Sequence, residues 1–277
     1  ATAAAQPYVV TPSAATGTGS FLASNYNITY TPFNGVVGQI AITITATGPT
    51  VKTYGTALSA GTSTTNFSVT GTLNTGEAVT GLTLTPNAAG VSATTAAGAA
   101  YVTTPSLATG SGGFLAANYT ITYIPYNGTV TTRALTITAT GPTKIYGTAL
   151  AAGTSAVNFT AGTAQNSEVV TGVTLTPNAA GLSLFAAAAA AYVVTPSLAT
   201  GSGGFLASNY NITYTPFNGT VATAPLTITA TGPAKAYGAV LSAGTSTTNF
   251  TAGTTQNSQT VTGVTLTPNA AGLSGTT

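Results

Sequence analysis

The sequence predicts an all-β chain, organised as tandem Ig-like β-sandwich modules in an elongated array. Three observations support this fold class. Apolar residues alternate with threonine at a period of two, which is typical of half-buried strands. Glycine, proline and asparagine separate these runs at spacings suited to a sandwich. The whole chain also repeats itself about every 92 residues, which is the length of a small domain.

The repeat divides the 277 residues into two complete copies and two partial ones. A tyrosine-glycine pair recurs at spacings of 92 and 91 residues, at Tyr54, Tyr146 and Tyr237. We expect complete modules over 38–130 (repeat 1) and 131–221 (repeat 2). Residues 1–37 (the N-terminal partial repeat) match the C-terminal part of a module, and 222–277 (the C-terminal partial repeat) match the N-terminal part. The linkers are short, as at 127–135, which favours a stiff array.

The two partial repeats are in register with each other. The motif YVVTPS begins at Tyr8 and again at Tyr192. A second copy placed directly after Thr277 would put its own Tyr8 93 residues beyond Tyr192. The chain is therefore either a window from a longer array, or a subunit whose partial modules a neighbour completes. Position 1 is not methionine and shows no signal-peptide pattern, as expected of a processed chain or a fragment.

Within each repeat the strands follow from the alternation. The clearest runs are 27–31, 135–140 and 172–177. In the second run, Leu135, Ile137 and Ala139 are expected to face inward, and the threonines between them outward. The inward residues of the other two runs are Ile28, Tyr30, Val173 and Leu175. Threonine, valine, isoleucine and tyrosine all favour strands, which strengthens the prediction.

Turn signals separate these runs. Gly-Pro follows TITAT in every copy, and TPNAAG follows LTL. Asn-Gly, a favoured tight-turn pair, occurs at Asn34-Gly35, Asn127-Gly128 and Asn218-Gly219. Counting the runs gives about seven strands per module. The alanine tract 186–191 is expected to be a loop or an irregular strand, because its counterparts differ between copies.

Charged residues make up only 2% of the chain, against about 25% in a typical soluble domain. They are Lys52, Glu77, Arg133, Lys144, Glu168 and Lys235. The hydrophobic content of 43% predicts a folded core rather than disorder. A net charge of +2 does not provide the basic surface that is typical of nucleic-acid-binding proteins. The longest apolar run, 184–194, is shorter than the ~18–20 residues of a membrane helix, so no transmembrane segment is expected.

The order of the motifs resembles the bacterial MBG domain, YGX type. The residues that carry the resemblance are KIYGTAL, VTGVTLTP, YVVTPS and NYTITYIPYNG followed by LTITAT, with Tyr-Gly-X at 54–56, 146–148 and 237–239. It covers essentially the whole chain in three periods. What it implies is an extracellular β-rich module that occurs in tandem in very large, adhesin-like or matrix-like bacterial surface proteins. It does not imply catalysis.

We expect no catalytic site, no metal site and no cofactor. Histidine, cysteine and aspartate are absent, which removes the usual nucleophiles and transition-metal ligands. Glu77 and Glu168 occupy the same position in different repeats, so they are expected about one domain apart, too far for an acid–base pair. Calcium normally takes several carboxylates. The segment TGSGGF at 109–114 and 200–205 lacks the lysine of a phosphate-binding loop.

The repeated lysine is the sharpest candidate for chemistry. Each copy lies two residues before the repeated tyrosine, which puts both on one face of a strand: Lys52, Lys144 and Lys235. An intramolecular isopeptide bond needs a lysine, an asparagine or aspartate, and a nearby acid. Its candidates are Asn66, Asn158 and Asn249 with Glu77 and Glu168, and the third copy has Gln259 in place of the acid. The favoured alternative is a lysine whose stem covers the tyrosine and whose amine is solvated.

Two further candidates concern sugars. Acceptor motifs for N-glycosylation occur at Asn27, Asn66, Asn118, Asn127, Asn158, Asn211, Asn218 and Asn249. Asn27 and Asn211 are expected to point outward from their strands. A sugar-binding aromatic stripe could include Tyr119, Tyr123, Tyr210 and Tyr214, although their alternation with threonine favours a role in the core.

Taken together, the sequence predicts a structural repeat segment of an extracellular bacterial filament or stalk. Its partner is expected to be itself, head to tail, with each split end module completed by a neighbour through strand addition. The alternatives are a glycan-binding adhesin module and a surface-layer or sheath lattice protein.

Overall fold

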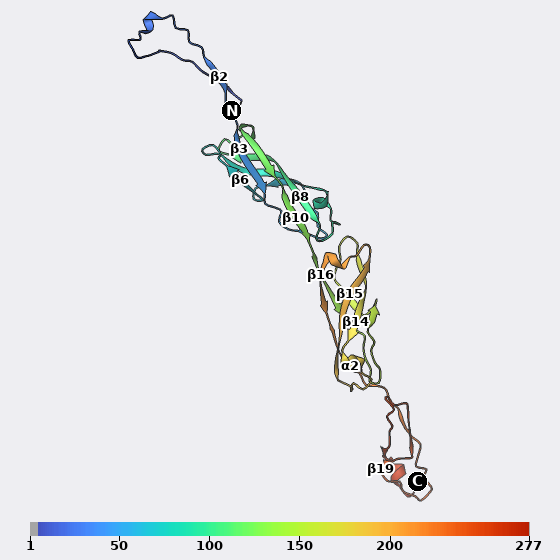
Figure 1. The fold of residues 1–277 in the computed structure, drawn as a ribbon. Coiled ribbons are helices and arrows are strands. Elements are labelled where there is room, and N and C mark those ends of the chain that lie inside the picture. Colours follow the sequence, from blue (N-terminus) through green and yellow to red (C-terminus); the bar gives the residue numbers. More distant parts are fainter. Residues whose placement is uncertain (1–4, 277) are drawn as a thin grey trace. The chain divides into compact units, whose positions relative to one another are not determined.

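A computed structural model describes residues 5–276, and the all-β prediction is confirmed because the only helices in that range are single turns (Figure 1). The chain divides into two compact units. Unit 1 comprises Ala1–Arg133 with Ser208–Asn211, and unit 2 comprises Ala134–Ala207 with Ile212–Thr277. The tetrapeptide Ser208–Asn211 therefore packs with unit 1, although the residues on both sides of it belong to unit 2.

Repeat 1 folds into two sheets within unit 1. Their strands are β3 (Ile40–Ala46), β4 (Lys52–Thr53), β5 (Gly61–Ser63), β6 (Phe67–Gly71), β7 (Ala78–Pro86), β8 (Ala100–Ser111), β9 (Tyr119–Ile124) and β10 (Tyr126–Thr131). One sheet has the order β4-β10-β8-β7-β5 and the other β6-β3-β9. The pairs β10–β4 and β3–β9 are parallel, and the remaining pairs are antiparallel.

One core joins the two sheets of repeat 1. β3 contributes Ile42 and Ile44, β7 contributes Leu82 and Leu84, and β9 contributes Tyr119. These side chains alternate with exposed or half-buried residues along their strands, except that Gly81, next to Leu82, is also buried. The layers of this sandwich therefore follow from the alternation that the sequence shows.

Repeat 2 has the same pairing and lies in unit 2 except for residues 131–133 and the tetrapeptide Ser208–Asn211. Its strands are β11 (Arg133–Ala139), β12 (Gly153–Ser155), β13 (Phe159–Ala161), β14 (Val169–Pro177), β15 (Ala191–Ser202), β16 (Tyr210–Thr215) and β17 (Phe217–Thr220). The sheets have the orders β12-β14-β15-β17 and β13-β11-β16. A parallel bridge between Ile145 and Ala222 takes the place of the β4–β10 pair. The predicted inward residues of β11 and β14 are buried, namely Leu135, Ile137, Ala139, Val173 and Leu175.

The Asn-Gly pairs do not form turns, and this prediction is wrong. All three lie inside strands: in β10, in β17 and in β2 (Phe33–Val36). Gly128 pairs with Tyr101, and a Cβ atom built on Gly128 would lie 2.3 Å from the ring of that tyrosine. The glycine leaves room for the buried ring, whose hydroxyl donates to Pro49 O at 2.7 Å. Tertiary packing thus overrides the local turn preference of Asn-Gly.

The turns form elsewhere. Each TPNAAG motif makes a one-turn helix: α1 (Ala88–Val91), α2 (Ala179–Leu182) and α3 (Ala270–Leu273). The asparagine before each helix caps it; the Oδ1 of Asn87, for example, accepts the N–H of Gly90 at 2.9 Å. The alanine tract 186–190 is a loop that leads into β15, as expected. At 127–135, β10 and β11 are separated by Thr132 alone, so the expected linker is almost entirely strand.

The partial repeats keep the pairings of the complete ones. β1 (Pro7–Val10) pairs with β2, and Tyr8 faces Gly35 as Tyr101 faces Gly128. In the C-terminal partial repeat, β18 (Ile228–Ala230) pairs with β20 (Phe250–Ala252), and β19 (Gly244–Ser246) with β21 (Val264–Leu266). These pairs correspond to β11–β13 and β12–β14 of repeat 2. Each of these three sheets has two strands.

The helices are far too short to cross a lipid bilayer. Over residues 5–276, none of them has the length and apolar character of a membrane span.

Candidate functional site

In the two complete repeats the repeated lysine is buried and acts as a clamp between two loops. In unit 1 the Lys52 Nζ donates to Thr56 O at 2.5 Å and to Ser92 O at 2.9 Å. Thr56 follows the Tyr-Gly pair, and Ser92 is the residue at the C-terminal end of α1. An ammonium group at this end of a helix meets carbonyls that have no partner in the helix. The lysine therefore fixes α1 against the Tyr-Gly turn.

The same clamp recurs in repeat 2, and the lysine of the C-terminal partial repeat also binds carbonyls at the end of its one-turn helix. Lys144 Nζ donates to Ser183 O at 2.8 Å and also to Thr148 O. Lys235 Nζ donates to Ser274 O at 2.7 Å and to Ala271 O at 2.6 Å. Lys52 and Lys144 are each only 1% exposed. The expectation of a solvated amine is therefore wrong for Lys52 and Lys144, because backbone carbonyls replace water around their ammonium groups.

Burial also affects the acid–base properties of this region. Desolvation lowers the pKa of Lys52, because the charged form loses contact with water. Burial raises the pKa of Tyr101 and Tyr192 for the same reason, since their ionised form carries the charge. The nearby Tyr126 adds to the effect at Tyr101.

The residues suggested for an isopeptide bond have separate surroundings in repeat 1. The Asn66 carboxamide lies beside Gly48, where a built Cβ would be 3.0 Å from its Oδ1. Its main chain is held by Thr47 N and by Ser63 Oγ. Asn158 and Asn249 have the same contacts in their copies. The lysine instead binds carbonyls, so Asn66 lies at a turn and Lys52 lies in the clamp.

The acid of the suggested triad has a different partner again. Glu77 Oε2 accepts a hydrogen bond of 2.5 Å from the Tyr119 hydroxyl, and that hydroxyl accepts the N–H of Asn74 at 3.1 Å. Burial is the main cause that raises the pKa of Tyr119. In repeat 2 the corresponding Glu168 is buried, and its N–H donates to Gln165 O. In repeat 1 the glutamate thus orients a core tyrosine.

The sugar candidates divide by exposure. Asn27, Asn127, Asn211 and Asn218 are exposed, and Asn66, Asn118, Asn158 and Asn249 are half-buried. Of the proposed aromatic stripe, Tyr119 and Tyr210 are buried and Tyr123 and Tyr214 are half-buried. The hydroxyls of the last two accept the backbone N–H of Ala108 and Ala199, at 3.0 and 2.9 Å. The four tyrosines are therefore core residues in the complete repeats.

A contact that the sequence motifs do not indicate involves the tetrapeptide Ser208–Asn211 within unit 1. The Asn209 Oδ1 accepts the N–H of Ala97 at 3.0 Å, and the ring of Tyr210 packs edge-on against Tyr54, with centroids 5.5 Å apart. Asn209 and Tyr54 are each 3% exposed. The sequence does contain a related signal, because residues 21–35 are identical to residues 205–219. That identity does not by itself indicate the contact, which becomes visible only in the folded structure.

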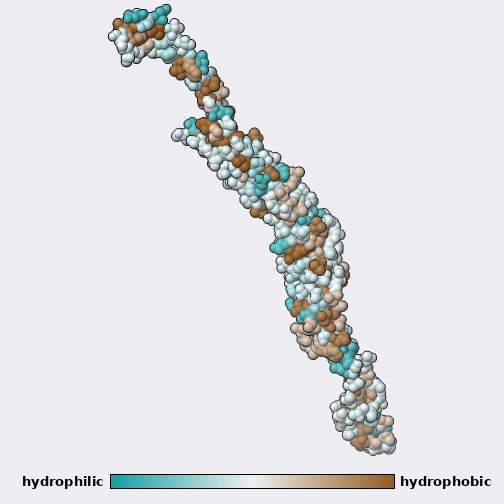
Figure 2. All heavy atoms as spheres, viewed as in Figure 1, coloured by the Kyte–Doolittle hydropathy of each residue, from teal (hydrophilic) through white to brown (hydrophobic). Residues whose placement is uncertain are grey.

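The partial repeats expose positions that the complete repeats bury. Ile137 is 0% exposed, whereas its counterpart Ile228 is 45% exposed. Tyr119 is 4% exposed and its counterpart Tyr26 is 61% exposed. Figure 2 shows apolar, brown side chains on the surface of the segment that carries β2 and of the segment that carries β19. The exposed faces of the partial repeats therefore carry the apolar residues of a sandwich core, but the part of the module that would cover them is absent from each partial repeat.

Among residues 5–276 there is no cluster of three or more side chains of the types that bind metal ions. Comparison of the chain with protein-family models, with curated proteins and with solved structures found no match. The similarity to MBG domains therefore stays a prediction from the motifs.

Proposed function

We propose that this chain is a structural repeat segment of an extracellular bacterial filament or stalk, built of Ig-like modules that join head to tail. In this assembly the N-terminal partial repeat of one copy completes the C-terminal partial repeat of another. The observation that carries the proposal is the contrast between exposed core positions in the partial repeats and their buried counterparts. The combined product is one further β-sandwich with the strand order of repeats 1 and 2.

The strand pairing supports this arrangement. In repeat 2, β15 pairs with β14 on one side and with β17 on the other. The corresponding β1 pairs with β2, and β21, the counterpart of β14, pairs with β19. Adding β1 to β21 would restore the order of the complete sheet. Strand addition across an open edge supplies main-chain hydrogen bonds and buries the apolar face at the same time.

Burial of the apolar face supplies the driving force. Leu226 and Ile228 are 46% and 45% exposed, against 4% and 0% for Leu135 and Ile137. Burying a fully exposed large aliphatic side chain contributes about 1.5–3 kcal/mol, so covering the exposed half of one contributes roughly half of that. Several such positions would be covered together on each partner, and these contributions act against the cost of association.

A charge placed on this face tests the proposal. Ile228→Lys would put an ammonium group at a position that must be buried in the completed module, whereas the side chain is exposed in the free chain. Thr227→Lys is the matched control, because its counterpart Thr136 is exposed in repeat 2. Sedimentation velocity over a range of concentrations should show end-to-end oligomers for the unmodified chain and for Thr227→Lys, but monomers for Ile228→Lys. Equal behaviour of both variants would contradict the proposal.

A further inference from the structure

We infer that the cavity around Tyr146 and Leu226 in unit 2 is a receptor for the Phe21–Tyr26 turn of a second copy of this chain. The inference rests on the head-to-tail assembly proposed above, and it names the residues that hold one copy to the next. Its two halves are the cavity and the turn, and each has a counterpart inside unit 1.

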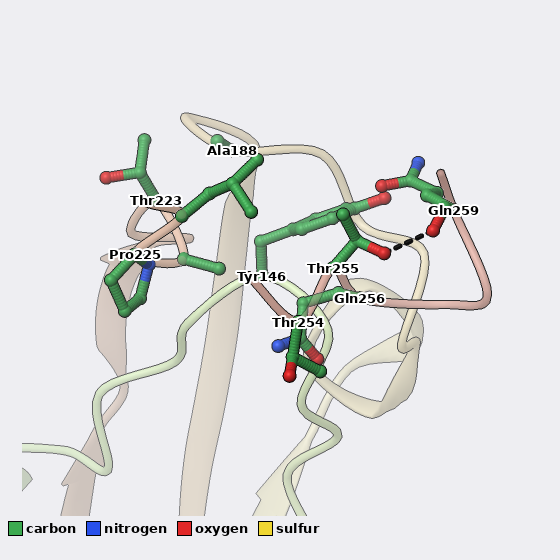
Figure 3. A pocket seen from close by; sticks show the side chains of 10 residues that line it. Tyr146, Ala188, Thr223, Pro225, Thr254, Thr255, Gln256 and Gln259 are labelled. Carbon is green, nitrogen blue, oxygen red and sulfur yellow. Dashed lines mark hydrogen bonds between the residues drawn. The ribbon is translucent and has the colours of Figure 1, made fainter. Parts of the chain in front are cut away.

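The cavity is mainly apolar and large enough for one aromatic side chain. Its volume is 230 Å³, and a cavity of about 150 Å³ already accepts a benzene ring. Figure 3 shows Tyr146 with Thr223 and Pro225 to one side and the segment Thr254–Gln259 to the other. Thr255 donates a hydrogen bond to Gln259 O within that segment. The lining residues are Tyr146, Ala188, Thr223, Ala224, Pro225, Leu226, Thr254, Thr255, Gln256 and Gln259.

Tyr119 in repeat 1 shows how a tyrosine fits such a cavity. Its hydroxyl is held by the N–H of Asn74 and by the Glu77 carboxylate. Asn74 and Glu77 correspond in the repeat to Gln256 and Gln259, both of which line the cavity. A tyrosine at the position of Tyr119 would therefore meet a backbone N–H and a carboxamide oxygen, which are an available donor and acceptor for its hydroxyl.

The tetrapeptide Ser208–Asn211, which we call the plug, shows a second set of contacts that the cavity could make. It joins Tyr210 to Tyr54 and Asn209 to the N–H of Ala97. The counterparts of Tyr54 and Ala97 are Tyr146 and Ala188, and both line the cavity. Among the described hydrogen bonds the N–H of Ala188 has no acceptor. The receptor thus carries the same pair of groups that unit 1 uses to hold its plug.

The turn that fits this receptor is already formed in the N-terminal partial repeat. Residues 21–35 have the same sequence as 205–219, the segment that supplies the plug of unit 1. The Phe21 and Tyr26 rings stack with centroids 5.2 Å apart, as the Phe114 and Tyr119 rings do at 5.1 Å. The 3₁₀ turns at Ala23–Asn25 and Ala116–Asn118 match as well. A preformed turn loses little conformational entropy when it binds.

Disulfide trapping tests the receptor directly, because the chain has no cysteine. One chain carries Asn25→Cys and a second carries Ala188→Cys, and they are mixed under oxidising conditions. Mass spectrometry should identify a disulfide between the two substituted positions. Leu22→Cys with Ala188→Cys is the control, because the counterpart Leu206 is 57% exposed and takes no part in the plug. The double variant Ala97→Cys with Asn209→Cys in one chain is the positive reference for the geometry.

A peptide of residues 21–30 gives an independent measurement on the intact chain. Calorimetry should detect its binding, and the Tyr26→Ala peptide should bind about tenfold or more weakly, as expected for an aromatic anchor. A Leu22→Ala peptide should bind like the unmodified one.

The outcomes separate this inference from the proposed assembly. If the chains associate but the disulfide does not form and the peptide does not bind, the receptor assignment is wrong and the assembly stands. If the peptide binds and the mixed single-cysteine chains crosslink while no oligomers appear, the receptor is right and the filament proposal is wrong. A disulfide formed equally by the Leu22→Cys control would overturn the assignment, since it would show contact without specificity.

Discussion

Replacing Thr103 with valine should stabilise unit 1. Thr103 lies in β8 and is 0% exposed, and within residues 5–276 its hydroxyl has no hydrogen-bond partner. Val194 occupies the same position in repeat 2 and is also fully buried. The pocket for a valine side chain is therefore already part of the fold, and Thr103→Val would replace an unpaired hydroxyl by a methyl group of similar size.

The expected gain follows from the cost of burying that hydroxyl. Proteins lose about 1–3 kcal/mol for a buried hydroxyl without a partner, so Thr103→Val should raise the free energy of unfolding by a similar amount. For a unit of about 130 residues, each kcal/mol corresponds to about 3–5 °C in Tm. The reverse change, Val194→Thr, should destabilise unit 2 by a similar amount.

Denaturant unfolding followed by hydrogen exchange of unit 1 peptides measures the change in the relevant unit. Thr104→Val is the matched control, because Thr104 is the next residue of the same strand and is exposed. Its effect should stay within about 0.5 kcal/mol. The reasoning is refuted if Thr103→Val gives no larger gain than Thr104→Val, because the hydroxyl would then have a partner in solution.

Three other predictions concern the packing and the clamp. Gly128→Ala should destabilise unit 1 by at least about 2 kcal/mol in denaturant unfolding, since its Cβ would lie 2.3 Å from the Tyr101 ring. The control Gly61→Ala should have little effect, because the space around its Cβ is open. Equal losses of stability in the two variants would contradict this prediction. Lys144→Met should lower the free energy of unfolding of unit 2 by about 2–5 kcal/mol, because two carbonyls lose a charged hydrogen-bond donor. The intact mass of the unmodified protein should show no loss of ammonia. A mass lower by one ammonia per crosslink would contradict the clamp. The raised pKa of Tyr101 and Tyr192 contributes stability that is fully present below the ordinary tyrosine pKa of about 10 and is lost as the pH rises through the folded-state pKa. Denaturant titrations should therefore show the free energy of unfolding falling above about pH 10. The fall should be less steep in Tyr101→Phe.

The alternation of side chains made the inner faces of the strands predictable. Leu135 and Ile137 are buried as expected, because a period of two leaves only one way to place an apolar face against a core. The Asn-Gly pairs were not predictable in this way. Their local preference is for a turn, and the tyrosine ring that requires Gly128 comes from a strand 27 residues earlier in the chain.

The lysine shows a similar limit. Its position two residues before the tyrosine predicted a shared face, and both Lys52 and Tyr54 are indeed buried. The acceptor at Ser92 is 40 residues away in sequence and belongs to the end of α1. No local pattern indicates that contact, so the sequence could select the residue without revealing its role. The plug formed by Asn209 and Tyr210 depends on a long-range contact in the same way.

Hydrogen exchange of the 277-residue chain at low and high concentration tests the central claim most directly. The claim is that residues 5–37 of one copy complete 222–277 of another. At high concentration, the amides of Tyr8–Val10 and Leu226–Ala230 should become protected together and approach the protection of their counterparts at 101–103 and 135–139. If these amides stay unprotected at concentrations where oligomers form, association occurs elsewhere and the account is contradicted.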